Sequence, residues 1–201
     1  STSVDRQIDM TAYRNNMLSM AKPLDSDYSI ILDSDVEFGS SLIREYLPYF
    51  SEEVSMVTPN VLQNIKCQMS EGARESYYDS FALIDRFGNQ GMTWAANPFF
   101  NTEDRNKWER GEEVEVRSAF GGCPMIKSAV LNEVEWSTDG GCEHWNFCRD
   151  VSSYGKIIVA PRIKVRVHLS ESIIQSISPS HMNSVVEKQR QILPLLSEMC
   201  K

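Results

Sequence analysis

The hydrophobic and polar positions of the chain follow two different periods. Four apolar positions within residues 8–21 recur at helical spacing: Met10, Tyr13, Met17 and Met20 or Ala21. This spacing predicts an amphipathic helix. Residues 28–32, YSIIL, are apolar and partly β-branched, which predicts a strand buried on both faces. A helix followed by a buried strand is the repeating unit of an α/β protein.

The middle of the chain continues this pattern and then becomes less regular. Residues 40–50 predict a short helix that Pro48 ends or bends, and residues 54–62 predict a second buried strand. Residues 69–115 carry many aromatic side chains among Gly, Asn and Pro. These aromatic side chains either line a ligand groove or seal a long insertion onto the core.

The C-terminal third returns to regular elements. A glycine break before residue 142 precedes a predicted helix that ends near Gly155, and residues 156–170 predict a strand pair split by Pro161. Ser178 and Pro179 are suited to the start of a last helix. The chain is therefore predicted to form one α/β domain over residues 1–201, with a mixed, mostly parallel sheet flanked by helices.

Composition narrows the class of protein. The 201 residues are 41% hydrophobic and 24% charged, which is ordinary for a soluble globular domain. The net charge of −8, without a basic cluster, argues against binding to nucleic acid. No apolar stretch approaches the roughly 20 residues of a membrane span. The five cysteines are irregularly spaced, so they are expected to be mostly free thiols rather than a disulfide framework or a zinc site.

Two acidic residues, Asp33 and Asp35, follow the first predicted strand. Because side chains alternate along a strand, both carboxylates are expected to point to the same side. Such like charges repel unless a cation or a base lies between them. Oxygen ligands at the carboxyl end of a strand suit a hard divalent cation that also binds phosphate oxygens. The pair therefore predicts a metal-held diphosphate, although a turn or a helix cap can contain the same triplet.

Two more residue types add candidate chemistry. His168, at the end of the last predicted strand, is either an ordinary histidine or a third metal ligand, and an imidazole would favour Mn²⁺ over Mg²⁺. Glu143 lies near a predicted helix start, where it either favours the helix dipole or acts as a general base. Asp139 and His144 are rivals for the role of base.

A pair of glycines, Gly121 and Gly122, follows the predicted strand VEVRS. Glycine permits backbone conformations that other residues avoid and lets a ligand approach the chain closely. A plain tight turn would have the same sequence.

Four stretches, taken in order, resemble a known family: YRNNMLSMA with YSIILDSDV, then YYDSFALIDRFGN, then SAFGGCPMIKSAVL, then CEHWNFCRDVSSYGKIIVAPRIKVRVHL. Together they are similar to nucleotide-sugar glycosyltransferases of the GT-A fold, in particular the cryptococcal capsule-associated mannosyltransferases and related chlorella-virus enzymes. The resemblance extends from about Thr11 to Leu169. It implies a Rossmann-like GT-A sheet.

The resemblance also implies roles for the donor side of the site. Asp33 and Asp35 would be the D-x-D motif of the family, with Asp35 on the metal and Asp33 reaching the ribose or sugar of the donor. His168 would complete the metal site. Arg14 and Asn15 match an Arg-Asn pair, in which Arg14 could face the diphosphate.

On the acceptor side, the resemblance implies that Gly121 and Gly122 border the donor sugar and the acceptor. Glu143 would occupy the acidic position near the acceptor, and Tyr78 and Asp79 would lie by the acceptor or the sugar.

The expected function is a metal-dependent glycosyltransferase that uses Mn²⁺ or Mg²⁺ to move a hexose from a UDP- or GDP-sugar to a hydroxyl of a glycan or glycoprotein acceptor. Only 32 residues precede Asp33, so the base-gripping unit of GT-A domains looks shortened or absent. The alternative is therefore a noncatalytic carbohydrate-binding domain with a degenerate donor site. A phosphohydrolase that uses Asp33 as nucleophile lacks a supporting lysine or threonine motif. The sequence leaves open the sugar, inversion or retention, and a cytoplasmic (including virus-infected host) or Golgi-lumen location.

Overall fold

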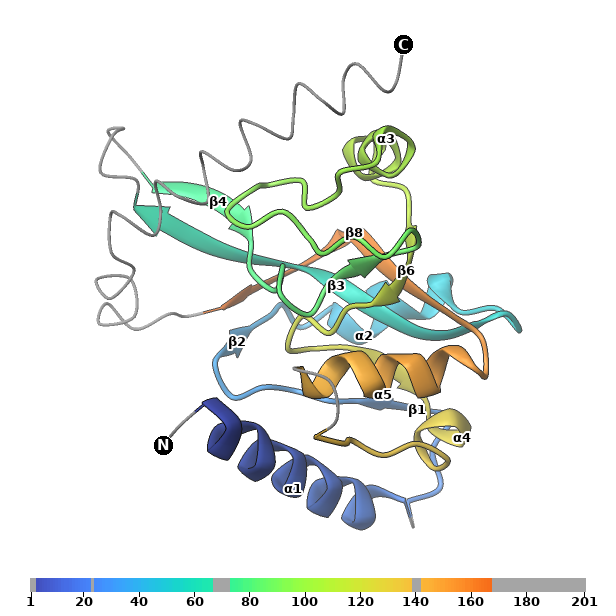
Figure 1. The fold of residues 1–201 in the computed structure, drawn as a ribbon. Coiled ribbons are helices and arrows are strands. Elements are labelled where there is room, and N and C mark those ends of the chain that lie inside the picture. Colours follow the sequence, from blue (N-terminus) through green and yellow to red (C-terminus); the bar gives the residue numbers. More distant parts are fainter. Residues whose placement is uncertain (1–2, 23, 67–72, 139–141, 168–201) are drawn as a thin grey trace.

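A mixed eight-stranded sheet organises the part of the chain that the computed structural model describes, residues 3–22, 24–66, 73–138 and 142–167 (Figure 1). Six strands follow one another across it in the order β1-β7-β3-β8-β6-β5, while β2 pairs with β8 and β4 pairs with β3. The strands are β1 (Tyr28–Ile30), β2 (Val36–Glu37), β3 (Val54–Lys66), β4 (Ala73–Tyr77), β5 (Ile84–Asp85), β6 (Val114–Ser118), β7 (Met125–Lys127) and β8 (Lys156–Val167).

Helices lie against this sheet. They are α1 (Ser3–Ala21), α2 (Leu42–Tyr46) with the short 3-10 turn η1 (Leu47–Tyr49), α3 (Thr102–Arg110), α4 (Ser128–Leu131) and α5 (Glu143–Ser152). In Figure 1, α5 lies in front of the sheet and α2 behind it. The α/β class and the flanking helices were correctly predicted. No helix in the described ranges is long and apolar enough to cross a membrane.

The two central strands, β3 and β8, carry the core of the sheet. Residues 54–63 of β3 are buried at every position, as the sequence predicted for 54–62. In β8, burial is continuous from Ile157 to Pro161 and then alternates from Arg162 to Val167. The first halves of both strands are therefore covered on both faces, while the end of β8 is covered on one face only.

The prediction of a mostly parallel sheet was wrong. Only β3 and β8 run parallel, and every other strand pairing in the described chain is antiparallel. The prediction rested on alternation of helices and strands along the sequence, which does not fix which strands become neighbours. Here β4 pairs back onto β3, and β7 and β6 lie antiparallel to the central strands.

The prediction of strand residues on both sides of Pro161 was correct, but the prediction that they form two strands was wrong. The structure has one strand, β8, whose pairing with β3 passes from Pro59↔Ala160 directly to Asn60↔Lys164. Pro161 lies in the skipped stretch, where its missing N–H costs no ladder bond. Its carbonyl accepts a hydrogen bond from Asn60 Nδ2 at 3.4 Å.

Strand β1 lies at an end of the strand order, and the prediction that it is buried on both faces was wrong. Tyr28, Ser29 and Ile30 are only half-buried, and Leu32 is exposed. In the described part of the chain, β7 is the one strand that pairs with β1. An apolar run of this length fits an edge strand as well as a central one, so the sequence could not distinguish them.

Helix α1 buries a different face from the one its apolar pattern indicated. Thr11, Arg14 and Leu18 face the core, whereas Tyr13 and Met17 are exposed. The helix itself was correctly predicted, although it begins earlier, at Ser3. Its inward face is partly polar because Arg14 has charged partners inside the protein, as described below.

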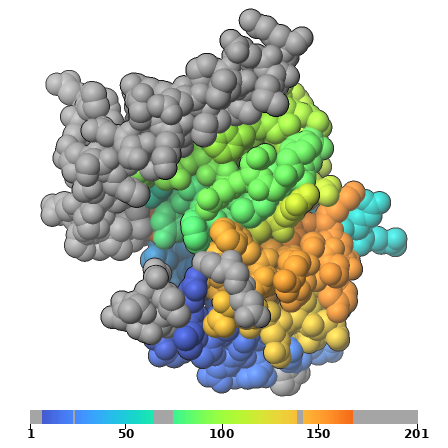
Figure 2. Space-filling view, in the orientation of Figure 1, coloured from blue at the N-terminus to red at the C-terminus, as the bar shows by residue number. Residues whose placement is uncertain are grey.

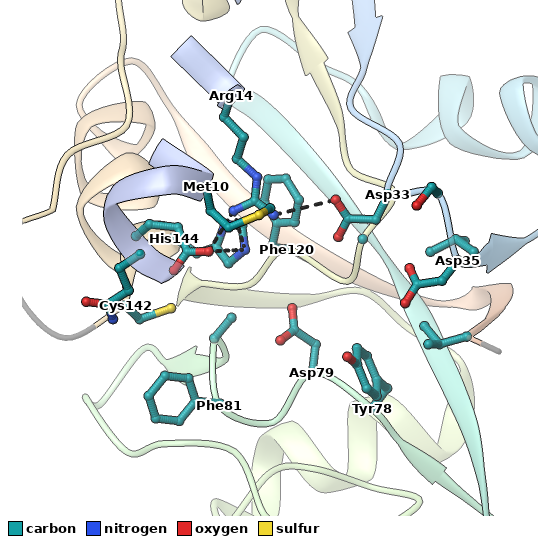
Figure 3. A pocket seen from close by; sticks show the side chains of 17 residues that line it. Met10, Arg14, Asp33, Asp35, Tyr78, Asp79, Phe81, Phe120, Cys142 and His144 are labelled. Atoms are coloured by element: carbon teal, nitrogen blue, oxygen red, sulfur yellow. Dashed lines mark hydrogen bonds and ion pairs between the residues drawn. The ribbon is translucent and has the colours of Figure 1, made fainter. Parts of the chain in front are cut away.

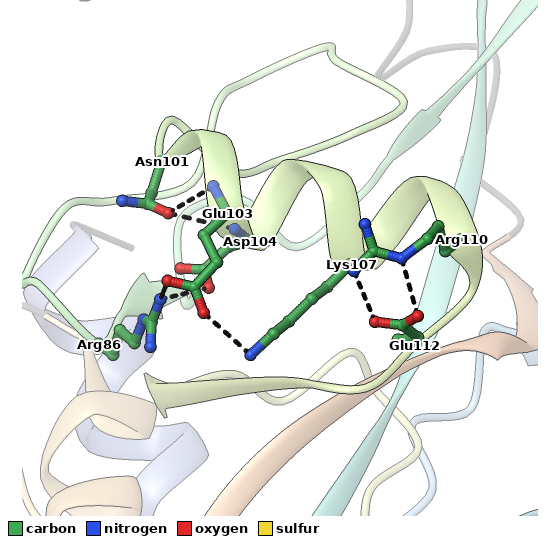
Figure 4. Close-up of polar contacts among 7 residues, drawn as sticks. All are labelled: Arg86, Asn101, Glu103, Asp104, Lys107, Arg110 and Glu112. Carbon is green, nitrogen blue, oxygen red and sulfur yellow. Dashed lines mark hydrogen bonds and ion pairs between the residues drawn. The ribbon is translucent and has the colours of Figure 1, made fainter. Parts of the chain in front are cut away.

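Helix α3 falls in the region that the sequence left irregular. Asn101 caps its N-terminus, because Oδ1 accepts hydrogen bonds from the backbone N–H groups of Glu103 and Asp104. Gly111 ends it in the left-handed conformation, with φ 73°. Ion pairs join the helix to Arg86 and to Glu112, and a third pair, Lys107 with Glu103, lies within the helix (Figure 4). Trp108 packs edge-on against Tyr77 and Phe99, so these aromatics seal the region onto the core.

Candidate functional site

A cleft of about 950 Å³ opens where four parts of the chain meet. Its walls come from α1, the start of α5, the turn at residues 33–36 and the segment at residues 78–82, with Phe120 and Gly122 also lining it (Figure 3). Most of the residues that the sequence singled out lie here. Among the described residues that line it, four carboxylates face a single guanidinium: Asp33, Asp35, Asp79 and Glu143 against Arg14.

Asp33 and Asp35 lie on a tight turn between β1 and β2. Asp33 N donates to the carbonyl of Gly122 at 2.8 Å, and Val36 N donates to the carbonyl of Asp33 at 3.3 Å. Val36 then pairs with Val167 at the end of β8. The turn is therefore tied to two neighbouring segments, and both carboxylates line the cleft, with Asp33 half-buried and Asp35 exposed.

The charge of Asp33 is only partly compensated. Burial raises the pKa of its carboxyl group above the ordinary value; the nearby guanidinium of Arg14 opposes this shift, and the charge of Asp35 adds to it. The ion pair with Arg14 is long, at 3.5 Å between Nη2 and Oδ1. A cation placed between the two aspartates would relieve this repulsion.

Gly122 lets the turn approach the sheet. Its φ is 63°, a left-handed conformation that favours glycine, and an added Cβ would lie 2.8 Å from Val36 Cγ2 and 3.2 Å from Asp33 Oδ2. Gly121, with φ 67°, presents its N–H to Asp79 Oδ2 at 2.7 Å. The paired glycines thus do more than form a turn, because they position two carboxylates of the cleft.

Arg14 is the centre of the hydrogen-bond network in the cleft. Its Nη1 donates to Glu143 Oε1 at 2.8 Å and to His144 Nε2 at 3.1 Å. Its guanidinium carbon lies 5.1 Å from the centre of the Phe120 ring, a cation–π distance. The side chains of Arg14 and Glu143 are only 8% and 16% exposed, so this pair is largely removed from water.

His144 is a neutral partner of this network. Arginine can only donate, so Nε2 accepts and the ring proton resides on Nδ1. Burial, and then the charge of Arg14, hold the pKa of His144 well below its ordinary value. The ring stacks on Phe120 with centroids 3.9 Å apart. His144 is therefore a poor candidate for a general base, and it positions Arg14 instead.

Glu143 keeps both of the roles that the sequence suggested. It is the first residue of α5 and lies in the first turn, where a carboxylate is favourable to the helix dipole. Its Oε1 is bonded to Arg14, and its side chain also lines the cleft.

Asp79 is the most perturbed acid of the site. Burial raises the pKa of its carboxyl group to about 7, the charge of Asp33 contributes in the same direction, and hydrogen bonds from the backbone of Gly121 and Ala82 oppose the shift. Figure 3 shows Asp79 pointing into the cleft, between Tyr78 and Phe81. A group with such a pKa can exchange a proton near neutral pH.

Four predicted site residues do not line the cleft or are not described, and the first is Gly121, whose N–H bonds to Asp79 Oδ2. Asn15 does not line the cleft, because its side-chain amide exchanges two hydrogen bonds of 2.9 Å with the backbone of Trp136. His168 and Asp139 fall outside the described residues. Val167, one residue before His168 in the sequence, does line the cleft.

Several cleft residues were not singled out from the sequence. Phe120 and Cys142 are buried in the wall, and Met10 also lines the cleft. Phe81 lines it too, and it is one of the aromatics of residues 69–115 that the sequence assigned either to a groove or to sealing an insertion. Phe120 and Cys142 each adjoin a residue that was predicted, so proximity in sequence was the one signal that could have found them. Cys142, like Cys123 and Cys148, is a free thiol, as expected, and burial raises its pKa to about 11.

The side chains of the cleft meet the coordination needs of a hard cation only in part. Within the described residues, no group of three or more His, Cys, Asp and Glu side chains could hold a metal ion. Two carboxylates such as Asp33 and Asp35 nevertheless meet the needs of Mg²⁺ or Mn²⁺, which commonly bind through one or two carboxylates and complete their coordination with water and phosphate oxygens. The residues present therefore fit a cation that is shared with a bound phosphate.

The chain matches no protein-family model and no curated protein sequence.

Proposed function

We propose that this protein is a metal-dependent glycosyltransferase that moves a hexose from a UDP- or GDP-sugar to a glycan hydroxyl. The observation that supports this most is the charge imbalance of the cleft, where four carboxylates surround one largely buried arginine. An anionic diphosphate would be repelled by this surface unless a cation binds with it. The resemblance in four ordered stretches points to the same chemistry.

Asp33 and Asp35 would hold the Mn²⁺ or Mg²⁺ ion, and His168 is proposed as a further ligand. When bound, the ion supplies positive charge that stabilises the departing nucleoside diphosphate. Arg14 adds a second positive charge beside Asp33 and orients Glu143 through the 2.8 Å bond to Oε1. This leaves Glu143 Oε2 to accept the proton of the acceptor hydroxyl.

Asp79 would lie by the acceptor or the transferred sugar, on the opposite wall. Its Oδ2 is fixed by the N–H of Gly121, and its position in the cleft leaves the carboxylate facing the space between Arg14 and the 78–82 segment. Tyr78, next to it, also lines the cleft. Hydroxyl groups of a sugar are natural partners for such a carboxylate.

The proposal is tested by calorimetric titration of UDP, GDP and their hexose conjugates in Mn²⁺ and in a chelator. Binding is expected in Mn²⁺ and absent in the chelator. Asp35→Asn, which removes the charge at constant size, is expected to weaken binding by at least about tenfold. Asp9→Asn is the control, because Asp9 is an exposed acid of α1 that does not line the cleft. Equal binding with and without metal would contradict the proposal.

A second candidate is the noncatalytic carbohydrate-binding domain with a degenerate donor site. It is favoured by the finding that the described residues contain no three-ligand metal cluster. Release of the nucleoside diphosphate from a bound donor separates the two functions. Turnover that requires Asp35 supports the transferase, whereas glycan binding with no donor binding supports the noncatalytic domain.

A further inference from the structure

Phe81, which lines the cleft, forms an aromatic pair with Trp145. Their ring centroids are 5.4 Å apart at an interplanar angle of 32°. The two residues come from different elements, the 78–82 segment and α5. Figure 2 shows the green segment around residue 80 meeting orange α5 at the surface of the molecule. Of the two, Phe81 lines the cleft, whereas Trp145 does not line it and packs beside Phe81 from α5.

The backbone that carries Phe81 is held firmly although its ring is exposed. The carbonyl of Phe81 accepts two hydrogen bonds, from Trp145 Nε1 at 3.2 Å and from Gln90 Nε2 at 3.1 Å. The next two residues, Ala82 and Leu83, are buried. Phe81 itself is 56% exposed. A large apolar side chain on a fixed backbone at a cleft mouth is suited to stack against a ligand, because the entropy cost of ordering it on binding is small.

The position of the pair separates it from the acidic turn. In Figure 3, Phe81 lies on one side of Asp79, with Tyr78 and Asp35 on the other side. Cys142 and His144 lie on the wall nearest Phe81 in the same view, and Glu143 stands between them in sequence. One end of the cleft is thus acidic and the other is aromatic, with carboxylates in between.

We propose that the Phe81–Trp145 pair is the acceptor subsite, on which the apolar face of a sugar ring of the acceptor stacks. A pyranose has a face of C–H groups and an edge of hydroxyl groups; the aromatic pair matches the first, and the carboxylates of Glu143 and Asp79 match the second. This rests on the proposed function, because the acidic end is assigned to the donor. The acceptor is therefore a pyranoside, held between the pair and the carboxylates.

The test uses simple methyl glycosides of mannose, glucose, galactose and xylose as probes. Binding is followed by the NMR signals of the four tryptophan indole N–H groups, with the signal of Trp145 assigned from Trp145→Phe. At least one glycoside is expected to shift the Trp145 signal. Phe81→Ala is expected to weaken that binding by about tenfold, whereas Phe81→Tyr retains it.

Phe87→Ala is the matched control, because Phe87 is 55% exposed but does not line the cleft. Equal losses in Phe81→Ala and Phe87→Ala would overturn the subsite, as would glycosides that never shift the Trp145 signal. If Asp35→Asn abolishes donor binding while Phe81→Ala binds glycosides normally, the subsite is wrong and the transferase proposal stands. If no donor binds but glycosides still require Phe81, the subsite stands as a sugar-binding site and the transferase proposal is wrong.

Discussion

Two clusters of charged side chains both combine arginine with aspartate and glutamate but behave in opposite ways. The α3 cluster comprises Arg86, Glu103, Asp104, Lys107, Arg110 and Glu112 (Figure 4). Its exposed acids have cationic partners, and hydrogen bonds from Arg86 to Glu103 and from Arg110 to Glu112 lower the pKa of those carboxyl groups. The cleft cluster comprises Arg14, Asp33, Asp35, Asp79 and Glu143, and there burial raises the pKa of Asp33 and Asp79.

The difference shows that burial and charge balance decide the role of an acid more than its neighbours in sequence do. On α3 the charges of the exposed acids are balanced and solvated, which is the arrangement of a structural surface. In the cleft the acids outnumber the cation and are partly desolvated, which favours binding of a positively charged ligand. Asp104 is the exception on α3, because it is buried and burial raises its pKa.

The largest effect is expected from removing the cation of the cleft. Arg14→Met keeps the stem that packs on Phe120 but leaves Glu143 without its partner, so the free energy of unfolding should fall by about 3 kcal/mol. Urea denaturation measures this loss. The double variant with Glu143→Gln should recover part of it, because no unpaired charge remains. If Arg14→Met were as stable as the wild type, the ion pairs of the cleft would contribute no more to stability than the exposed ion pairs on α3.

A glycine in each region gives the next comparison. Gly122→Ala and Gly111→Ala both place alanine in a left-handed conformation, which costs about 1 kcal/mol. At Gly111 the new Cβ meets the flexible side chain of Arg162, whereas at Gly122 it meets Val36 of β2 and the carboxylate of Asp33. Gly122→Ala should therefore lose about 2 kcal/mol or more.

Mn²⁺ titration of the two glycine variants adds a functional readout. The affinity for the ion should fall in Gly122→Ala, where the Asp33 turn is displaced, and stay at the wild-type value in Gly111→Ala. Equal loss of Mn²⁺ affinity in both variants would show that the Asp33 turn has no specific part in binding the ion.

The two clusters should also respond oppositely to pH. Asp79 has a pKa of about 7 in the folded state, above its ordinary value of 3.8. The folded protein thus holds a proton that the unfolded chain releases, so this contribution to stability decreases as pH rises from about 4 to about 7. For Glu103 and Glu112 the folded-state pKa lies below the ordinary 4.5, so their contribution is present above that value and is lost as pH falls further.

Asp79→Asn isolates the first effect, measured by urea denaturation in a chelator. At pH 8 the variant should exceed the wild type by on the order of 1 kcal/mol, and the difference should vanish near pH 4. A difference that grows toward low pH would contradict the assignment.

The smallest effect is expected on the α3 surface. Glu112→Gln breaks the ion pair with Arg110, whose Nε donates to Oε1 at 2.8 Å, but both side chains are exposed. The thermal midpoint at pH 7 should stay within experimental error of the wild type. A clear drop would show that the α3 charges act as a network rather than as separate solvated pairs.

Much of the local structure was predictable from the sequence. Short-range signals exist for the apolar runs of β3 and β8, for helix α5 and for the acidic turn after β1. The reason is that the spacing of apolar and polar residues over a short stretch indicates which positions are buried. Helix α3 was missed, because its sequence TEDRNKWER is almost wholly polar and its stability depends on its caps and on Trp108.

The sequence by itself determined the positions of most strands and helices and the presence of paired acids and paired glycines. Only the tertiary structure decided the antiparallel order of the sheet, the inward face of α1, and the meeting of Arg14 with Glu143, which is 129 residues away in the sequence. The physical reason is that a local sequence pattern indicates which positions are buried, but not which distant residues they contact. Desolvation and charge balance, which raise the pKa of Asp79, exist only after distant segments have closed around it.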